Sequence, residues 1–488
     1  MIKILRAALT ADEIAAAAGF FSFGANDLAR PPSASPGTMW MDFCPIPFET
    51  VLKGFAREIS SAKPAGIFER METTLKYGQG HLTLSLPEKA GISVLQPSSL
   101  PVLENLEEAF GRAMDTPLGG VPLKAMATPR TVAIAVPDET RPAPVRALLP
   151  LLLKRLYGVF MDLRPDDITI VVAAGLHPPL DEAGLRRVVP EAVAPGCRII
   201  SHDALHSPMK DCGRTSRNTP VLTNACFAGA DLRILIGNID PHQFVGFTGG
   251  AKVAVIGCGS SRTIEANHAL MFHDRAKVAN IEGNPVRMDI DEAGRMIGIP
   301  LVINVVLDGD KRPVQLLAGE PVAVYQAGAA TCAAIYGVAV PEKFDIAIAS
   351  CGGHPKDITL YQAQKGLAHA AQAVKPGGKI LLLAACPQGV GDDVYFEYVS
   401  RFPTPEAALE DFKRMGFKMG AHKSFLFGRT LVAFDVAIAA DMDPAVLQKC
   451  HLRACDPQKM VERWVADFTG KPSLAVIPNA NTTYFYQP

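Results

Sequence analysis

The sequence lacks the features that mark disulfide-rich, nucleic-acid-binding and membrane-spanning proteins. Its ten cysteines include no C-x-x-C pair, which argues against a zinc ribbon, an iron–sulfur site or a disulfide framework and fits a reducing compartment. Lysine and arginine (48) almost balance aspartate and glutamate (49), so a net charge of −1 offers no basic surface for nucleic acid or anionic lipid. No apolar run approaches the roughly 18 residues that a membrane-spanning helix needs. These absences predict a soluble, cytoplasmic protein that binds neither nucleic acid nor membrane.

Motifs of several enzyme classes are also missing. No G-x-S-x-G or H-E-x-x-H occurs, which argues against the hydrolases that use them. No G-x-G-x-x-G is followed by an acidic residue about 20 positions on, which counts against a free dinucleotide as cofactor. What is present is an apolar content of 48% and a charged content of 20%, both typical of globular proteins. At 488 residues the chain is too long for one core, so two or three domains are expected.

The first 70 residues predict a helical N-terminal extension. The opening segment, MIKILRAALTADEIAAAAGFF, is apolar, but Asp12 and Glu13 interrupt it where a signal peptide needs an unbroken apolar core. We therefore expect a helix here and not an export signal. Just after Thr73, the run LKYGQGHLTLSLP alternates apolar and polar residues and predicts one half-exposed strand.

Apolar runs alternate with helix-like segments over the rest of the chain. From about residue 130 to about residue 338 this alternation implies a parallel sheet with right-handed crossovers, and a second α/β unit starts at Phe344. We expect an α/β fold: two α/β domains with mainly parallel sheets and the active site in the cleft between them. The expected segments are an N-terminal α/β domain at residues 71–340, a C-terminal α/β domain at residues 341–470, and a final strand at residues 471–488 that returns to the N-terminal domain.

The stretch best suited to bind a ligand is residues 231–271. An apolar run from Leu232 to Ile236 predicts a buried strand, which a glycine-rich loop with His242 and Lys252 and then a helix follow. Such a loop lets the backbone approach a ligand, and the N-terminus of the helix favours an anion such as a phosphate. A lysine there is either a phosphate counter-ion or, with a lowered pKa, a nucleophile. Each feature alone is more often structural, so the interpretation depends on their combination.

Polar side chains also follow other predicted strands, at the edge where open α/β sheets bind ligands. A Pro-punctuated loop after the strand at residues 130–137 would hold a polar ligand or, equally, cap the next helix. A histidine ends the strand within residues 167–177. On a helix of the second unit, a glutamine and a lysine three residues apart suit a carboxylate, although a solvated helix face would also explain them. These side chains are Asp138, Thr140 and Arg141, then His177, then Gln362 and Lys365.

Together, these motifs resemble the nickel-pincer lactate racemase family. The resemblance rests on PDETRP (137–142), AAGLH (173–177), the block from His242 to His268 and LYQAQKG (360–366), and it covers about residue 73 to the C-terminus. It implies an isomerase: a racemase or epimerase that moves a hydride reversibly between a 2-hydroxy acid and a nickel-pincer nucleotide, through a 2-keto acid. The cofactor of the family is pyridinium-3-thioamide-5-thiocarboxylic acid mononucleotide with Ni.

The resemblance also implies a role for each motif residue. Lys252 would carry the covalently attached cofactor, and His268 would be the protein ligand of nickel, a metal that neutral imidazole suits. His177 and His242 would be paired acid/bases, since the pKa of histidine lies near the working pH. Cofactor-biosynthesis proteins would be partners, and the chain could form a homodimer. The cofactor contacts would be Asp138, Glu139, Thr140 and Arg141, and the substrate carboxylate would meet Arg141, Gln362 and Lys365.

The sequence departs from the family pattern around the substrate. Pro178 follows His177 where an arginine is expected, and no tryptophan lies in the His422–Phe427 region. The cofactor residues are complete while the substrate pocket is changed, so we expect a larger or more polar 2-hydroxy acid than lactate, such as a sugar acid or a hydroxy-diacid. Two alternatives stay open: a pyridine-nucleotide oxidoreductase with a free cofactor, and a catalytically inactive binding homologue.

Overall fold

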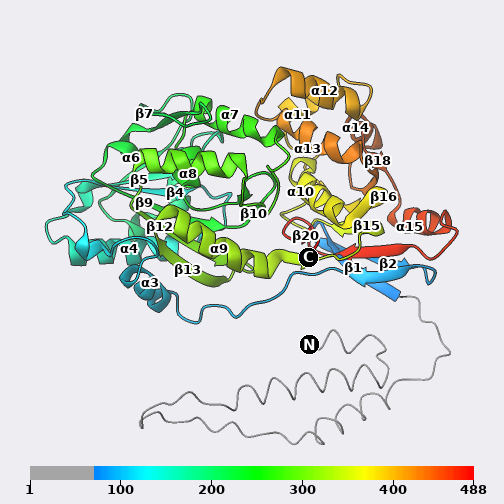
Figure 1. Ribbon diagram of the computed structural model, residues 1–488, viewed down its shortest axis with the longest axis horizontal. Coiled ribbons are helices and arrows are strands. Elements are labelled where there is room, and N and C mark those ends of the chain that lie inside the picture. The colour runs from blue at the N-terminus through cyan, green and yellow to red at the C-terminus, as the bar shows by residue number, and fades with distance from the viewer. Residues whose placement is uncertain (1–70) are drawn as a thin grey trace, which may run out of the picture. The chain divides into compact units, whose positions relative to one another are not determined.

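Two six-stranded sheets, each covered by helices, form the framework of the computed structural model (Figure 1). The structure describes residues 71–488, so the helical extension expected at residues 1–70 lies outside the described part. Within that described part, no helix is both long and apolar enough to span a membrane. The nine cysteines it contains are all free thiols.

The first sheet has the strand order β13-β12-β9-β4-β5-β6, and all neighbours are parallel except β13 and β12. The chain runs from β4 outward to β5 and β6, then returns to the other side of β4 as β9. The reversal of strand order creates a switch point between β4 and β9, which is where such sheets bind ligands. The strands are β4 (Val132–Pro137), β5 (Ile168–Ala173), β6 (Arg198–Ser201), β9 (Leu232–Ile239), β12 (Leu301–Leu307) and β13 (Pro313–Gly319).

Helices cover both faces of this sheet, which is why its central strands are apolar without alternation. All six residues of β4 are buried. Ile134 and Val136 face a core that includes α3 and α4, whereas Ala133 and Ala135 face a core that includes α6 and α8. The helices of this half are α3 (Leu106–Asp115), α4 (Val145–Val159), α5 (Glu182–Val188), α6 (Ala225–Gly229), α7 (Ser261–Ala269), α8 (Pro285–Ile297) and α9 (Pro321–Tyr336).

Local signals fix the ends of α8, which supports the site. The side chain of Asn284 accepts hydrogen bonds from the backbone N–H groups of Val286 (3.1 Å) and Arg287 (3.3 Å), and Pro285 occupies the first helical position. Gly298, with a φ of 71°, ends the helix in the left-handed conformation that glycine adopts without strain.

The second sheet has the order β18-β17-β16-β15-β19-β3 and is parallel throughout. The final segment expected at residues 471–488 divides between two sheets. β19 lies in this second sheet, between β15 and β3, whereas β20 (Tyr484–Tyr486) pairs with β14 (Gly337–Ala339), at the end of the segment assigned to the N-terminal domain. β3, which was also assigned to the N-terminal domain, belongs to the second sheet. Four of the five residues of β19 are buried, a pattern that needs an interior position in a sheet covered on both faces. The strands are β3 (Gly91–Val94), β15 (Phe344–Ser350), β16 (Val374–Leu383), β17 (Asp435–Ala439), β18 (Arg453–Ala454) and β19 (Ser473–Ile477).

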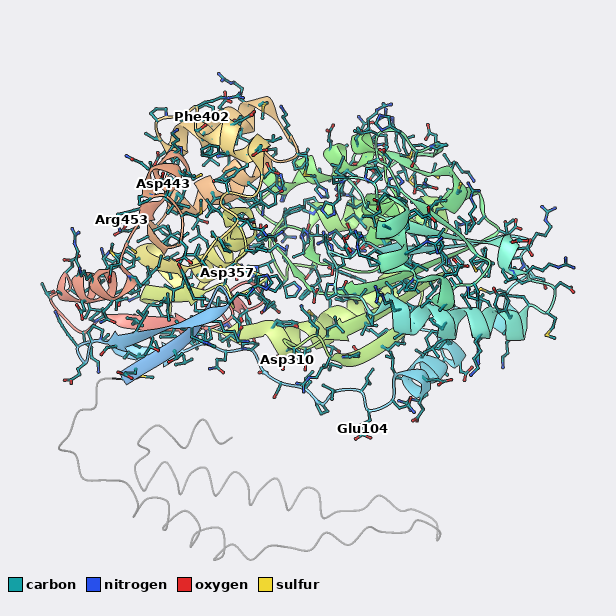
Figure 2. The ribbon with its side chains drawn as sticks, turned by 180° about the vertical axis from the view of Figure 1, so that it is seen from behind. Glu104, Asp310, Asp357, Phe402, Asp443 and Arg453 are labelled. Atoms are coloured by element: carbon teal, nitrogen blue, oxygen red, sulfur yellow. The ribbon has the colours of Figure 1, made fainter. Side chains whose placement is uncertain are left out.

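The run after Thr73, expected as one strand, is a hairpin of β1 (Met71–Tyr77) and β2 (Gly80–Leu86). Gly78 turns the chain with a φ of 53°, and Asp357 of the second half accepts a hydrogen bond from its N–H group (2.7 Å; Asp357 is labelled in Figure 2). The remaining paired strands are β7 (Met209–Arg214) with β8 (Pro220–Asn224), β10 (Pro241–His242) with β11 (Gly246–Phe247), and β14 (Gly337–Ala339) with β20 (Tyr484–Tyr486).

Helices of the second half also pack against the first. Phe425 of α13 joins the apolar core beneath α8 and contacts the ring of Phe272 edge-on at 5.0 Å between centroids. This contact brings the beginning of α13 close to the end of α7. The helices are α10 (Leu360–Ala370), α11 (Asp393–Val399), α12 (Pro405–Met415), α13 (His422–Leu431), α14 (Pro444–Lys449) and α15 (Pro457–Ala466).

Candidate active site

The first sheet delivers polar side chains to one edge from three adjacent strands. Asp138 follows β4, His177 follows β5, and His242 follows β9, all at the carboxyl ends. Their positions therefore flank the switch point. Adjacency in the sheet, and not in the sequence, brings these residues together.

His177 and Asp138 form a hydrogen-bonded pair. The distance between His177 Nδ1 and Asp138 Oδ2 is 2.6 Å, and Thr140 donates from both its N–H and its hydroxyl group to Asp138 Oδ1. Burial raises the pKa of the Asp138 carboxyl, but the hydrogen bonds from His177 and Thr140 outweigh it and leave the pKa below its ordinary value. The carboxylate thus stays ionised and orients the imidazole, with Nε2 of the half-exposed ring directed away from it.

The other two residues of the same loop differ. Glu139 forms an ion pair with Arg187 of α5 (3.2 Å) and is drawn toward the outer surface. Arg141 is exposed, and its positive charge acts on His242, Lys252 and Lys365. The structure therefore groups Arg141, but not Glu139, with the other candidate residues.

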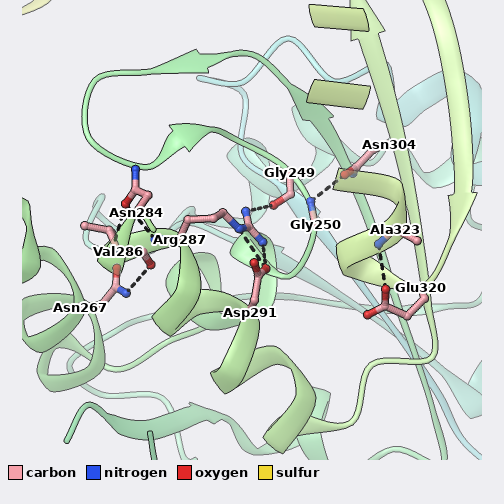
Figure 3. A network of polar contacts seen from close by, with 10 residues as sticks. All are labelled: Gly249, Gly250, Asn267, Asn284, Val286, Arg287, Asp291, Asn304, Glu320 and Ala323. Carbon is pink, nitrogen blue, oxygen red and sulfur yellow. Dashed lines mark hydrogen bonds and ion pairs between the residues drawn. The ribbon is translucent and has the colours of Figure 1, made fainter. Parts of the chain in front are cut away.

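A polar network holds the glycine loop that precedes Lys252 (Figure 3). Arg287 of α8 donates from Nη1 to the carbonyl oxygen of Gly249 (3.0 Å), and Asn304 of β12 accepts from the N–H group of Gly250 (2.8 Å). Arg287 is in turn paired with Asp291 one helical turn away. The side chains of α8 and β12 thus fix the path of the loop.

Gly249 is required at its position. Its φ is 93°, and a Cβ there would lie 2.5 Å from Ile239 Cγ1 and 2.8 Å from Asn304 Oδ1. We expect Gly249→Ala to lower the free energy of unfolding by about 1–3 kcal/mol, the usual range for a strained backbone position. Urea unfolding measures the change. Gly309→Ala is the matched control, because a Cβ at Gly309 would meet nothing within 4 Å; an equal loss in both variants would contradict the argument.

Lys252 has the environment of a neutral amine. It is half-buried at the start of a π-helical turn (Val253–Gly257), and no ion pair joins it to a carboxylate in residues 71–488. Burial and three neighbouring cations lower the pKa of Lys252 well below its ordinary value. An unprotonated amine is a nucleophile, and proximity to other cations is an established way to obtain one. The three cations are Arg141, Arg287 and Lys365.

His242 and His268 lie on either side of one phenyl ring. Phe244 contacts His242 at 4.7 Å and His268 at 5.1 Å between ring centroids, edge-on in both cases. Burial, followed by the charge of Lys252, lowers the pKa of both histidines: that of His268 to about 3, and that of His242 well below its ordinary value. Both imidazoles are therefore neutral near pH 7.

His268 presents a free nitrogen lone pair. Its Nδ1 lies 3.1 Å from Asn267 Oδ1, an acceptor, so the proton is on Nδ1 and Nε2 is free. Asn267 is itself fixed, because its amide nitrogen donates to Asp289 Oδ2 (2.9 Å) and to the carbonyl oxygen of Val286 (3.2 Å). A hydrogen-bonded second nitrogen is the usual arrangement of a metal-ligating histidine.

The described residues contain no metal site made by protein alone. Nowhere in residues 71–488 do three His, Cys, Asp or Glu side chains gather to hold an ion. A metal bound to His268 would need its other ligands from a non-protein group.

The second half adds Lys365 from α10. This lysine is half-buried, and its charge acts on His242 and on Lys252 across the two halves of the chain. Burial first, and then the charge of Arg141, lower the pKa of Lys365 to about 8. Gln362, expected beside it, is exposed, and only its backbone forms hydrogen bonds within residues 71–488.

Three buried residues next to Lys365 were not foreseen. Lys423 of α13 donates a hydrogen bond to Gln364 Oε1 of α10 (3.0 Å), and His422 precedes it. The signal in the sequence is weak but present: a His-Lys pair opens the apolar run SFLFG, where a lysine gains nothing from burial alone.

Comparisons with known proteins agree over both halves. Residues 77–279 match the family model of the lactate racemase N-terminal domain, and residues 340–482 match that of the lactate racemase C-terminal domain. The lactate racemase of Lactiplantibacillus plantarum is 30% identical over 388 residues, which are 78% of this chain and 91% of that protein. The lactate racemase of Thermoanaerobacterium thermosaccharolyticum is 28% identical over 341 residues, 69% of this chain and 79% of that protein.

Two solved structures share the fold. The lactate racemase apoprotein from Thermoanaerobacterium thermosaccharolyticum superimposes with a TM-score of 0.78 at 24% identity, covering 86% of this chain and all (100%) of the other. A protein from Thermotoga maritima gives a TM-score of 0.56 at 15% identity, covering 80% of this chain and 100% of the other. At these identities the likeness concerns the fold, two α/β halves with mainly parallel sheets.

Proposed function

The chain belongs to the lactate racemase family and is an isomerase of the racemase class, and from this premise we propose that it racemises or epimerises a 2-hydroxy acid by hydride transfer with a nickel-pincer nucleotide attached to Lys252. The observation that carries the proposal is the cluster at the switch point: a lysine without an ion-pair partner in residues 71–488, whose pKa burial and neighbouring cations lower, near a histidine whose Nδ1 is bonded to Asn267 and whose Nε2 is free.

The residues present fit the proposed cofactor. The neutral Lys252 amine can form the covalent bond, and His268 can supply one nitrogen to a nickel whose remaining ligands belong to the pincer. Arg141, which is exposed, offers a cation to the nucleotide phosphate. When bound, the nickel-pincer group supplies a hydride acceptor that also returns the hydride.

Of the two remaining histidines, one accepts the proton of the substrate hydroxyl group and the other returns a proton. Burial, and then the positive charges around it, lower the pKa of His242 well below its ordinary value, so the neutral ring is ready to accept the proton of the substrate hydroxyl group. His177 is held by its hydrogen bond to the Asp138 carboxylate, which fixes the direction of the ring, and we assign it the proton that returns to the substrate. One enantiomer therefore loses its hydroxyl proton to His242, and the 2-keto acid takes a proton from His177 to give the other. The reverse reaction starts from the exchanged protonation states.

Lys365 holds the carboxylate next to the reacting carbon, so that the planar keto acid can turn while its carboxylate stays fixed. This role predicts a pH dependence. The ammonium form binds the carboxylate, and it is lost as the pH rises through about 8, where the pKa of Lys365 lies. We expect KM to rise about tenfold per pH unit above that value, with kcat less affected. Initial rates from pH 6.5 to pH 9.5 test this, and a flat KM would contradict it.

The experiment that tests the function is a racemisation assay in ²H₂O. Protein co-produced with a cofactor-making system is given single enantiomers of several 2-hydroxy acids, without nicotinamide nucleotide. We expect the opposite enantiomer to appear with its C2 protium retained, because a transferred hydride does not exchange with solvent. Deuterium at C2 would indicate proton abstraction instead, and a requirement for added nucleotide would favour the free-cofactor oxidoreductase.

The cytoplasmic location, the biosynthetic partners and a homodimer stay predictions.

A further inference from the structure

Lys423 is a buried lysine without a buried counter-ion. Its side chain is on a residue only 5% exposed, and no ion pair joins it to a carboxylate in the described part of the chain. Its ammonium group bonds to Gln364 Oε1 and lies 4.3 Å above the centroid of the Tyr361 ring. The negative charge of Asp392 acts on it from a distance, but that carboxylate accepts the N–H group of Tyr395 as the cap of α11. Burial lowers the pKa of Lys423 well below its ordinary value, so an ammonium group is stable here only with an anion beside it.

Two further polar atoms beside Lys423 are buried and unpaired. They are Nε2 of Gln364 and Nδ1 of His422, on residues 0% and 7% exposed. Folded proteins rarely leave buried polar atoms without partners, and the exceptions concentrate at functional sites. The amide nitrogen can only donate, and the imidazole can donate from Nδ1. The ammonium and both unpaired groups therefore require an acceptor.

This group of donors adjoins the proposed reaction centre. The ring of Phe417 is 5.4 Å from that of His422 and 5.6 Å from that of His268, so one ring separates the two histidines. The charge of Lys365 further lowers the pKa of Lys423. One phenyl ring thus links His422 to His268, and Lys423 lies close enough to Lys365 for the charge of Lys365 to act on it.

We propose that Lys423, Gln364 and His422 bind a second carboxylate, and that the substrate is a 2-hydroxy dicarboxylate. This inference rests on the proposed function and names its substrate class. A carboxylate accepts several hydrogen bonds and neutralises the buried ammonium, so it satisfies every unpaired group at once. A hydroxyl group of a sugar acid can also accept these hydrogen bonds, but it is neutral and leaves the ammonium without a counter-ion. Lys365 and Arg141 hold the carboxylate next to the reacting carbon.

The test compares substrates that differ in the second carboxylate. With the nickel-loaded enzyme, we expect kcat/KM for (S)-malate to exceed that for L-lactate at least about tenfold. Lys423→Met, of similar length and uncharged, should raise KM for malate about 30-fold or more and leave KM for lactate within about threefold. Lys423→Arg should restore most of the loss. Lys418→Met removes an exposed lysine just before α13 and should change neither value.

The remaining outcomes separate the second carboxylate site from the proposed function. Racemisation of lactate but not of malate, or equal KM changes for both in Lys423→Met, overturns the dicarboxylate and leaves the proposed function standing. If Lys423→Met loses nickel at an unchanged melting temperature, Lys423 belongs to the cofactor site, and the proposed second carboxylate site is overturned.

If no 2-hydroxy acid is turned over, the proposed function fails. Calorimetric titration with succinate then tests the second carboxylate site by itself. At least about tenfold weaker binding to Lys423→Met than to the unmodified sequence supports it, whereas equal or absent binding overturns it.

Discussion

Lys252→Ala is expected to lose the covalent adduct, the bound nickel and racemisation together. The reason is that a single amine provides the proposed attachment, and burial and neighbouring cations lower its pKa, which favours the nucleophilic form. Without a hydride acceptor the rate should fall by the whole enzymatic enhancement, which is at least about a millionfold in ordinary enzymes. Intact mass, metal analysis and chiral chromatography on the same preparation measure the three losses.

Two variants make this prediction specific. Lys252→Arg keeps a cation of similar reach but lacks the nucleophilic amine, so it should also form no adduct. Lys277→Ala removes an exposed lysine of the same half and should keep adduct, nickel and activity. An adduct of unchanged mass in Lys252→Ala would place the attachment elsewhere and refute the assignment.

Asp138→Asn is expected to lower kcat by about 100-fold or more while leaving cofactor content unchanged. The 2.6 Å contact to His177 Nδ1 gives the carboxylate two tasks, to orient the ring and to balance its positive charge. An amide performs neither well, and a misplaced general acid or base forfeits about 100- to 10,000-fold in rate. Because the acid is affected, the pH profile of kcat should change shape, which loss of a purely structural contact would not cause.

The experiment separates two roles for Asp138. If nickel and adduct fall in proportion to kcat, Asp138 serves mainly as a cofactor contact, the role implied by the family resemblance. If they stay constant, it acts through His177. Asp203→Asn is the matched control, because Asp203 forms a similar bond with the exposed His206 (3.0 Å), away from the cluster. That variant should keep the kcat of the unmodified sequence.

The sequence predicted well where one element determined the outcome. Apolar runs without alternation indicated buried parallel strands, and β5, β9, β12 and β15 lie where such runs occur. The helix expected from Pro285 is α8, because capping and termination signals are local. The position of His177 at the end of its strand also followed from one segment alone.

Prediction failed where the outcome depended on distant partners. Nothing in SLAVI shows whether it joins the first or the second sheet, because that choice depends on which strands offer a free edge. The bond between Lys423 and Gln364 joins residues 59 apart on two helices, and neither position has a distinguishing neighbour pattern. Likewise, Asp138 does not cap α4, one of the two alternatives for it, but contacts a histidine 39 residues away, and its role as a ligand contact stays a prediction.

The position of α13 has an evolutionary consequence. The residues proposed to carry the cofactor lie on loops and helices of the first sheet, whereas Lys365, Gln364 and Lys423 lie on α10 and α13 of the second. A new substrate preference can therefore arise by substitutions in these two helices, without changes in the residues proposed to attach the cofactor. Exchanging a few side chains on α10 and α13 between relatives should transfer preference for one hydroxy acid or another, so this scaffold is a natural starting point for engineered racemases.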